Sequence, residues 1–535
     1  MDQAKQLASA VTDKLSQAFV GMTDSTYKHA GTMTKLTGHP IGEGKHSITA
    51  GPQGPLVVDV QLLEKLQQFT REKIPPRNVH ALGYGAYGEF TVTNDISEYT
   101  SADIFNAVGK KTPLFTRFSG IFTEVGDADT TRDPRGFAIK FYTKEGNWDL
   151  MGINTPVFAA RDSKIGPDNV HAFKRDPRNG AWQSDQFWDF VALHPEGLHQ
   201  VLMLYTDRTG TPMSWRTMNG YGCHTFSLLN KNGTRHWVKW HIISQQGARG
   251  FTVQQAKTVA GEDPNFLGRD LYNALESKQY PKWKLMMQIM PEADGYKNPW
   301  TFDCTKIWKH SDYPLIDVGE IVLNRNPTDY HSEVEQVAFA PTTYVPGMGL
   351  SPDKLLQGRL LIYDDTQYHR LGPNFKQLYI NRAHGIEPMN NYVGGQHNQE
   401  IRNKFPHYYP SVFGGLQPDP KYKEQPMQTN GPADYYAPVD EYSDEDIYSQ
   451  CTIFWNAIDD QQRLNMIDNF AVALVKVKEQ KIVDLMINHL LKISSALGSG
   501  VRQKVEEKKA GKGKTAAELM VDNFAKDLMS INSSV

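Results

Sequence analysis

Cysteine is scarce in this sequence: Cys223, Cys304 and Cys451 are the only three among 535 residues. They lie far apart and none belongs to a C-x-x-C pair, which excludes a disulfide framework and argues against a cysteine zinc site. An excess of charge of one sign is also lacking, because 57 Lys and Arg residues nearly balance 60 Asp and Glu residues. Without a basic field, neither nucleic acid nor an anionic membrane is an expected partner.

Long hydrophobic runs are absent as well. No window approaches the ~18 apolar residues of a membrane helix, and the N-terminal stretch MDQAKQLASAVTDKLSQAFVGMTD has no continuous apolar segment. We therefore expect neither a membrane span nor a secretory signal. The remaining composition, with 39% hydrophobic, 22% charged and 11% aromatic residues, is that of a folded protein. The length predicts about three or four structural units around at least one large core.

Between residues 75 and 320 the sequence has the character of β-strands. Short runs rich in β-branched and aromatic residues are separated by turn sequences such as KEGN at 144–147. This region predicts a largely antiparallel sheet or barrel with helical interruptions near 255–278. The predicted strands are EFTVT (89–93), FTRFSG (115–120), GFAIKFYT (136–143), HQVLMLYT (199–206), HTFSLLN (224–230) and HWVKWHII (236–243).

The rest of the chain divides by pattern into four further segments. Residues 1–74 carry few core patterns and predict a helix followed by an extended arm. Residues 321–440 are rich in Pro, Gly and Asn, which predicts a segment that wraps over other surfaces. Apolar residues at i, i+3/i+4 spacing in 441–507 predict packed amphipathic helices. Residues 508–535 predict a basic linker and a last short helix.

A glycine-rich stretch, GYGAYG at 83–88, matches the dinucleotide pattern G-x-G-x-x-G. A Rossmann loop needs a strand before this pattern and a helix after it. Here Pro75-Pro76 precedes the stretch and a predicted strand follows it. We therefore reject the dinucleotide loop and infer that the glycines allow close approach of the backbone to something crowded.

Two further patterns are suggestive, although each has an ordinary structural explanation. His80 follows a basic segment, and an isolated histidine is more often structural than catalytic. Arg359 and Tyr363 are four residues apart, so on a helix the guanidinium reaches the phenol oxygen. A cation there favours the phenolate, the form that binds ferric iron, although a surface Arg packed on a Tyr would look the same in sequence.

Taken together, these segments resemble the haem catalase family, of the small-subunit, tyrosine-ligated monofunctional type. The resemblance runs in order from about residue 40 to residue 460, and it implies an α+β fold. That fold has an eight-stranded antiparallel β-barrel as haem domain, an N-terminal arm, a wrapping segment and a C-terminal helical domain, assembled as a homotetramer. The matching blocks are F-x-R-E-x-I-P-x-R-x-V-H (69–80), RFS (117–119), DPRGFA (133–138), GNWDL (146–150), MNGYG-x-HTF (218–226), DYPLI-x-VG (312–319), LNRNP (323–327) and SPDK to HRLGP (351–373).

The resemblance implies a haem b site with a role for each matching residue. His80 is implied as the base on the distal side of the haem, with Ser119 as its hydrogen-bond partner. Tyr363 is implied as the proximal phenolate ligand of the iron, with Arg359 as its charge partner. The other implied haem contacts are Arg77, Val79, Arg117, Phe158 and Arg370.

The distal residues depart from the family pattern. Catalases carry Asn where this chain has Ile153, and Asn154 matches the second Asn of the family motif. Neighbours on an extended segment point to opposite sides, so Asn154 is not expected to replace the lost donor. Ala159, Gly166 and Asn169 stand where the family usually has Phe, which predicts a more open distal side.

Three functions remain open on these grounds. The first is haem-dependent decomposition of hydrogen peroxide to water and oxygen, with a rate lowered by the lost hydrogen bond. The second is a catalase-derived haem protein that acts on bulkier organic hydroperoxides or other organic substrates. The third is a non-enzymatic role in haem binding or storage.

The resemblance also implies an NADPH site and a peroxisomal location. Ile243 replaces the Lys that pairs with the NADPH phosphate, so the affinity is expected to be weakened, with Arg208 and His241 as remaining cations. The C-terminal Ser533-Ser534-Val535 is a poor peroxisomal signal, which leaves the cytoplasm as the alternative location. The positions matching NADPH contacts are His199, Thr206, Arg208, Asn219, His241, Trp308, His310, Gln450 and Phe454.

Overall fold

The computed structural model describes residues 31–392, 405–427, 435 and 443–511. The chain divides into two compact units, Met1–Pro76 and Arg77–Val535. The helix predicted before residue 31 and the helix predicted after residue 511 lie outside the described residues. Among the described residues, no helix is both long enough and apolar enough to cross a lipid bilayer.

The first unit contains one described helix, α2 (Val60–Phe69), and isolated β-bridges. Asp59 caps this helix by accepting a hydrogen bond from the Leu62 N–H at 3.1 Å, and its other oxygen accepts one from the Ile48 N–H at 2.8 Å. Large apolar side chains such as Val57 and Phe69 are exposed. Residues 31–76 therefore bury little of their own apolar surface.

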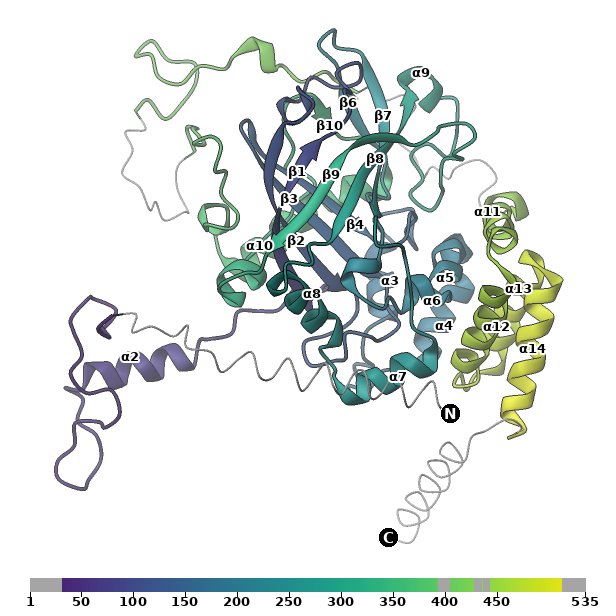
Figure 1. Cartoon of the computed structure of the whole chain (residues 1–535), viewed down its shortest axis with the longest axis horizontal. Helices are drawn as coiled ribbons and strands as arrows, with labels where there is room; N and C mark the ends of the chain where they lie inside the picture. Colours follow the sequence, from purple (N-terminus) through teal and green to yellow (C-terminus); the bar gives the residue numbers. More distant parts are fainter. Residues whose placement is uncertain (1–30, 393–404, 428–434, 436–442, 512–535) are drawn as a thin grey trace. The chain divides into compact units, whose positions relative to one another are not determined.

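The second unit is built around a closed antiparallel β-barrel (Figure 1). The sheet order is β10-β6-β7-β5-β4-β3-β2-β1-β9-β8, and the additional pairing of β7 with β8 closes it into eight strands. The α+β barrel fold predicted from the sequence is confirmed. The strands are β1 (Gly83–Val92), β2 (Lys111–Gly120), β3 (Arg135–Thr143), β4 (Gly146–Ile153), β5 (Gly220–Tyr221), β6 (Phe226–Leu229), β7 (Arg235–Ser244), β8 (Lys282–Pro291), β9 (Ile316–Arg325) and β10 (Met348–Gly349).

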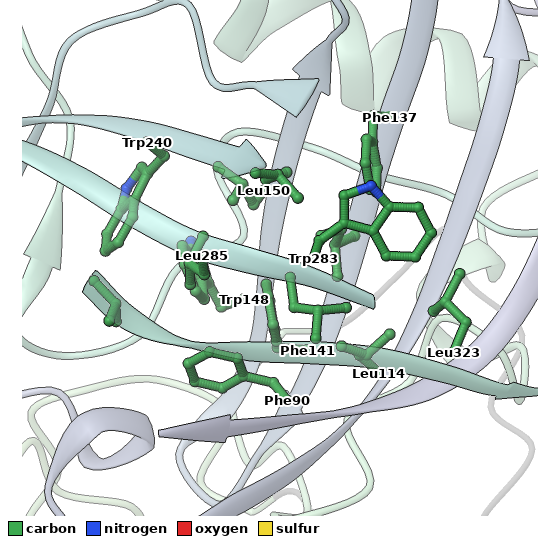
Figure 2. Packing of buried hydrophobic residues seen from close by; sticks show 14 of the residues in the cluster. Phe90, Leu114, Phe137, Phe141, Trp148, Leu150, Trp240, Trp283, Leu285 and Leu323 are labelled. Carbon is green, nitrogen blue, oxygen red and sulfur yellow. The ribbon is translucent and has the colours of Figure 1, made fainter. Parts of the chain in front are cut away.

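Large side chains fill the interior of the barrel (Figure 2). The Phe141 ring stacks on Trp148 with centroids 4.6 Å apart, and the Phe137 ring meets Trp283 edge to face at 5.4 Å. An eight-stranded barrel encloses just enough room for its own side chains. A large ligand must therefore bind outside the barrel, against the other face of the strands.

The glycine-rich stretch 83–88 is part of β1, where the neighbouring strands come very close. A Cβ on Gly85 would lie 2.4 Å from the Phe115 ring of β2, and one on Gly88 would lie 2.2 Å from the Val322 carbonyl oxygen of β9. The glycines are therefore required by crowding, as inferred from the sequence.

Helices that precede β5 and helices that follow β9 in the sequence pack together and form a second core. Helices α4, α5 and α6 pack against the C-terminal helices α11–α14 (Figure 1), and both groups contribute to one apolar cluster. The amphipathic helices predicted near the C-terminus are confirmed. These helices are α4 (Ser184–Leu193), α5 (Leu198–Leu204), α6 (Asp207–Gly210), α11 (Asp444–Ala457), α12 (Asp460–Leu474), α13 (Gln480–Ile493) and α14 (Ser495–Lys509).

The strand predicted at 199–206 is wrong, because this segment forms helix α5. All seven residues of the helix are buried. A segment buried on every side shows no alternation of polar and apolar residues, so periodicity cannot separate strand from helix. Leu and Met, which fill most of it, are good helix formers.

The remaining helices connect the strands. Two of them, α7 and α8, confirm the helical interruption predicted near 255–278. The π-helical segment is η5, and the other η segments are 3₁₀-helices. The elements are η2 (Asp103–Phe105), α3 (Gly166–Ala172), η3 (Pro195–Gly197), η4 (Trp215–Thr217), α7 (Val253–Glu262), α8 (Phe266–Glu276), α9 (Glu292–Gly295), η5 (Tyr330–Glu335), α10 (Lys354–Leu371), η6 (Phe375–Gln377) and η7 (Pro420–Tyr422).

Candidate active site

Three neighbouring strands carry a row of residues on the outer face of the barrel. Ser119 on β2 pairs with Gly136 on β3, and Gly136 pairs with Ile153 on β4. Side chains alternate along a strand, so Phe118 and Phe137 lie in the barrel core while their neighbours in the row face outward. The fold therefore brings together Ser119 and Ile153, which are 34 residues apart in the sequence.

His80 lies over this row, just before β1. A Cβ on Gly136 would lie 2.4 Å from Ser119 Oγ and 2.7 Å from His80 Nδ1, so only glycine leaves room for the ring. His80 Nδ1 and Ser119 Oγ are 2.9 Å apart, a hydrogen bond that orients the imidazole. The backbone of His80 has a φ of 65°, a strained conformation that is often found at functional sites.

Burial and nearby cations keep the His80 ring neutral. Burial is the largest cause that lowers the pKa of His80 from 6.5 to about 3, followed by the positive charges of Arg117, Arg359 and Arg77. A neutral imidazole can accept a proton at any pH near neutrality. The ring is therefore in the protonation state that a general base needs.

Ile153 makes the other end of the row apolar. It is 5% exposed and packs in a cluster with Ile121, Cys223, Val79 and Phe158, among others. Beside His80 the row therefore offers an aliphatic surface in place of a hydrogen-bond donor.

The next residue, Asn154, points elsewhere, and both ends of its amide are used. Its Oδ1 accepts from the Arg135 N–H at 2.9 Å, and its Nδ2 donates to the Thr209 carbonyl at 2.7 Å. Asn154 thus cannot supply the donor that is missing at position 153.

Helix α10 carries Arg359 and Tyr363 one turn apart. Nη2 of Arg359 donates a hydrogen bond to the Tyr363 phenol oxygen. Burial by itself lowers the pKa of Arg359, but the Tyr363 phenol raises it, and the net pKa lies above the ordinary value. The Arg359 guanidinium also lies 5.7 Å from the Phe158 ring centroid, next to the cluster that contains Ile153. The phenol therefore has a permanent cation beside it.

A pair that the sequence reasoning missed holds the start of this helix. His224 Nδ1 and Asp353 Oδ2 are 2.7 Å apart, and both side chains are fully buried. The other oxygen of Asp353 accepts from the N–H groups of Leu355 and Leu356 and so caps α10. The sequence did contain a signal for this pair, because His224 lies in the matching block HTF and Asp353 lies in the matching block SPDK. This pair positions the helix that carries Arg359.

Cys304 lies beside this pair, with its thiol, His224 and Asp353 all within 4.8 Å of one another. Burial raises the pKa of the Cys304 thiol well above its usual value. The protonated thiol donates to the Ala160 carbonyl at 3.1 Å. Cys304 is therefore a structural thiol.

Arg117 and Arg370 are buried, and Arg77 is partly buried close to them. Burial lowers the pKa of each, and the charge of Arg117 lowers those of Arg77 and Arg370 further, the last to about 10. Arg117 donates to the His80 carbonyl at 2.8 Å, and the other two share the Val337 carbonyl. Arg77 Nη1, Arg117 Nε and Arg370 Nε have no hydrogen-bond partner among the described residues.

These features fit a haem. Three neighbouring cations keep N–H groups without a hydrogen-bond partner, and these suit the two carboxylates of the porphyrin, which need cationic partners when buried. One of these groups, Arg77 Nη1, also lies 3.6 Å from a carboxylate oxygen of Glu335. A tyrosine phenol with an adjacent guanidinium suits ferric iron. Val79, Ile153 and Phe158 supply apolar contact for a flat ring system. The residues of this region therefore match the group that the sequence implies.

The residues expected to contact NADPH lie near the C-terminal helices and β7. The ring centroids of His199 and Phe454 are 6.1 Å apart, and those of His241 and His310 are 6.0 Å apart. His199 Nδ1 and Trp308 Nε1 have no hydrogen-bond partner in the part of the chain that the structure describes.

Four of these positions differ in how free they are to bind a ligand. Gln450 exchanges two hydrogen bonds with the main chain of Ile307, and the Thr206 hydroxyl donates to the Met203 carbonyl at 2.6 Å. Asn219 donates to the Tyr221 hydroxyl at 3.1 Å. Arg208 is exposed.

One expectation for this nucleotide region needs correction. His241 was expected to offer a cation to the phosphate. Burial lowers the pKa of His241 to about 4, so the ring is neutral near pH 7. Arg208 is left as the cation among the two that were expected.

Known proteins resemble this chain over most of its length. The family model described as Catalase matches residues 34–415, and the model described as Catalase-related immune-responsive matches residues 441–505. The catalase of the Onchocerca volvulus endobacterium is 45% identical over 477 residues, covering 88% of this chain and 97% of that protein. The catalase of Ascaris suum is 45% identical over 494 residues, covering 90% and 89%.

Solved structures agree with the sequence comparisons. Catalase A from Saccharomyces cerevisiae superposes with a TM-score of 0.85 at 36% identity, covering 89% of this chain and 99% of that one. A fungal catalase gives the same TM-score and identity, with 90% and 98% covered. With a family model across more than half of its length and relatives this similar, the chain belongs to the catalase family.

Proposed function

We propose that this protein decomposes hydrogen peroxide to water and oxygen with a haem held by Tyr363. The observation that carries the proposal is the neutral, partly buried His80, oriented by Ser119 at 2.9 Å and lying within electrostatic reach of Arg359. Membership of the catalase family supports the same reaction. Two molecules of hydrogen peroxide yield two of water and one of oxygen, so no other oxidant or reductant is required.

Each residue has a task that its surroundings support. His80 Nε2 accepts the proton from one peroxide oxygen and returns it to the other, so that water leaves. Ser119 holds the ring by its Nδ1, and Arg359 stabilises the Tyr363 phenolate. Arg77, Arg117 and Arg370 neutralise the haem carboxylates. A bound haem supplies the iron that exchanges electrons with peroxide.

Oxygen evolution by the purified, haem-loaded protein tests the proposal. We expect oxygen release over a series of hydrogen peroxide concentrations, and His80→Ala should lower kcat/KM by at least about a hundredfold, because general base catalysis contributes that much. The haem absorbance of the variant serves as the control for cofactor occupancy. Oxygen release at an unchanged rate by a fully loaded His80→Ala protein would exclude His80 as the base.

We also propose a homotetramer. Its support is the exposed apolar surface of residues 31–76 and of the segment around Tyr408, Val412 and Phe413, which a monomer leaves in water. Light scattering at micromolar concentration should give about four times the chain mass of 60.4 kDa. A mass near that of one chain would contradict the assembly.

NADPH binding of weak affinity and a peroxisomal location complete the proposal. The unpartnered His199 Nδ1 and Trp308 Nε1 support a polar ligand beside α11, and the exposed Arg208 supports a phosphate. Fluorescence titration with NADPH tests the first point. The location rests on the family resemblance, and cell fractionation distinguishes it from the cytoplasmic alternative.

A further inference from the structure

A stacked aromatic pair lies at the edge of the apolar cluster that contains Ile121 and Ile153. The Phe122 and Phe173 rings stack with centroids 3.9 Å apart and planes inclined by 14°. Phe122 packs directly against the cluster. Both stacked residues are partly exposed, whereas Ile121 and Ile153 are buried. The aromatic pair therefore lies between the solvent and the apolar surface beside His80.

The segment that carries Phe122 is held firmly next to His80. The His80 N–H donates to the Ile121 carbonyl at 2.8 Å, and the Ile121 N–H donates to the Pro134 carbonyl at 3.0 Å. The Phe122 N–H donates to an oxygen of the Asp133 carboxylate at 2.9 Å. Phe122 is therefore fixed on the side of the site that bears the proposed base.

Phe173 belongs to a segment that is attached to this side by surface contacts. The two residues that follow it also contact the chain around His80. Lys174 Nζ donates to the Asn78 carbonyl at 2.7 Å. Arg175 Nε donates to the Glu124 carboxylate at 2.9 Å, and these two side chains are 48% and 50% exposed. An exposed ion pair and a single ring stack each contribute little stability, so this attachment can open.

We propose that Phe122 and Phe173 form a gate on the way to His80, which favours hydrogen peroxide over hydroperoxides with bulky substituents. Rings in stacking contact leave no passage between them, so a bulky molecule enters only when Phe173 moves away from the fixed Phe122. Hydrogen peroxide is small enough to pass beside the closed pair. This inference rests on the proposed function, because it concerns the access of peroxide to His80.

Two haem ligands of different size test the gate on the haem-loaded protein without any peroxide. Cyanide is small and imidazole is a planar ring, and the change in haem absorbance after rapid mixing gives the association rate of each. In Phe173→Ala the association rate of imidazole relative to that of cyanide should rise at least about tenfold, the scale on which a pocket discriminates by size. The dissociation rate of imidazole should rise by the same factor, because a gate slows entry and exit alike.

Substrate consumption gives a second comparison. The ratio of kcat/KM for cumene hydroperoxide over hydrogen peroxide should also rise about tenfold in Phe173→Ala. Phe190→Ala is the matched control, because Phe190 on α4 stacks on His194 with centroids 4.0 Å apart and planes inclined by 16°, outside the cluster of Ile153. It should leave both ratios unaltered. If Phe173→Ala lowers the Tm, the milder Phe173→Leu gives the same comparison.

A variant of the attachment tests the gate without altering either ring. Arg175→Gln removes the ion pair with Glu124, so the gate should open more often and the association rate of imidazole should rise about two- to fivefold. Arg178→Gln removes a cation from the same segment, but the partner of Arg178 is Asp176 of that segment. This control should leave the rate unaltered.

The outcomes separate the two proposals. Unchanged ratios in Phe173→Ala overturn the gate, and so does imidazole that fails to reach the haem of this variant. An equal rise in Phe190→Ala overturns it as well. Oxygen evolution from hydrogen peroxide by the unmodified protein is measured alongside. Its absence overturns the proposed function, while the association rates of cyanide and imidazole still decide on the gate.

Discussion

At position 153 an aliphatic side chain lies beside the proposed base, and this residue sets the chemistry of the site. The register across β2, β3 and β4 puts Ile153 next to Gly136, over which the His80 ring lies. A peroxide held there receives one hydrogen-bonding group from His80 and an apolar surface from Ile153. The nearby Asn154 cannot compensate, because its amide is committed to Arg135 and Thr209.

Ile153→Asn should therefore raise hydrogen peroxide turnover. One added hydrogen bond to peroxide is worth about 1.4 kcal/mol, or roughly a tenfold gain in kcat/KM. Initial rates of oxygen evolution at matched haem occupancy provide the measurement.

Ile121→Asn is the control, because it makes the same change in the same apolar cluster away from the strand register. A similar gain in both variants would show that added polarity in the cluster raises the rate, and not a donor placed at position 153. No gain from Ile153→Asn would show that the donor is dispensable in this protein.

At the scale of a single element, β3 acts as the support for the histidine. Its inward residues Phe137, Ile139 and Phe141 belong to the barrel core, which fixes the strand. Its outward residue Gly136 provides the one position in the row that has no side chain. The orientation of the His80 ring therefore depends on the absence of a side chain at Gly136 of β3.

Gly136→Ala should reduce peroxide turnover strongly while the barrel still folds. The added Cβ would lie within 2.7 Å of both Ser119 Oγ and His80 Nδ1, so the imidazole must move. Displacement of a catalytic group by about 1 Å can cost on the order of a hundredfold in rate. Steady-state oxygen evolution, together with circular dichroism to verify the fold, measures the effect.

Gly261→Ala is the matched control, since a Cβ at that position of α7 has no neighbour within 4 Å. We expect this variant to keep the activity of the unmodified protein. Full activity in Gly136→Ala would mean that the loop of His80 adjusts freely and that the glycine is not required.

At the scale of the whole molecule, the described residues form two large apolar cores, and the proposed site lies outside both. Aromatic side chains fill the barrel, and a second cluster joins α4–α6 to α11–α14. The proposed haem residues lie on the outer face of the strands and on α10. Titratable groups buried in this arrangement connect the stability of the whole fold to pH.

The protein should lose stability as the pH falls below about 6.5. Burial lowers the pKa values of His80, His199 and His241 to about 3, about 4 and about 4. In the unfolded chain these histidines take up a proton near pH 6.5, whereas in the folded protein they stay neutral until the pH is much lower. The free energy of unfolding should therefore decrease by up to about 1.4 kcal/mol per pH unit for each of these histidines.

Denaturant unfolding at about pH 7 and about pH 5.5 provides the measurement, because most carboxylates have not yet titrated in this window. His199→Gln should reduce the pH dependence by the share of one histidine. His171→Gln, at an exposed position of α3, should leave it unaltered. Equal stability at the two pH values would contradict the burial of neutral histidines.

The sequence by itself determined the local features: most of the barrel strands that it marked, the C-terminal helices, and the contact of Arg359 with Tyr363 one turn away. These depend on periodicities that are visible along a short stretch of chain. The helix α5 was misjudged because burial on all sides erases that periodicity. Strands β4, β8 and β9 were overlooked, although in β8 Lys282 and Lys284 alternate with Trp283 and Leu285.

Only the tertiary structure decided how the candidate site is assembled. The pairing of Ser119, Gly136 and Ile153 in one row is a matter of strand register, which long-range contacts set. The neutrality of His80 arises from burial and, among the nearby cations, from the guanidinium groups of Arg117 and Arg359, which are far away in the sequence. The support of α10 by His224 also depends on segments meeting in space, because His224 and Asp353 are 129 residues apart in the sequence.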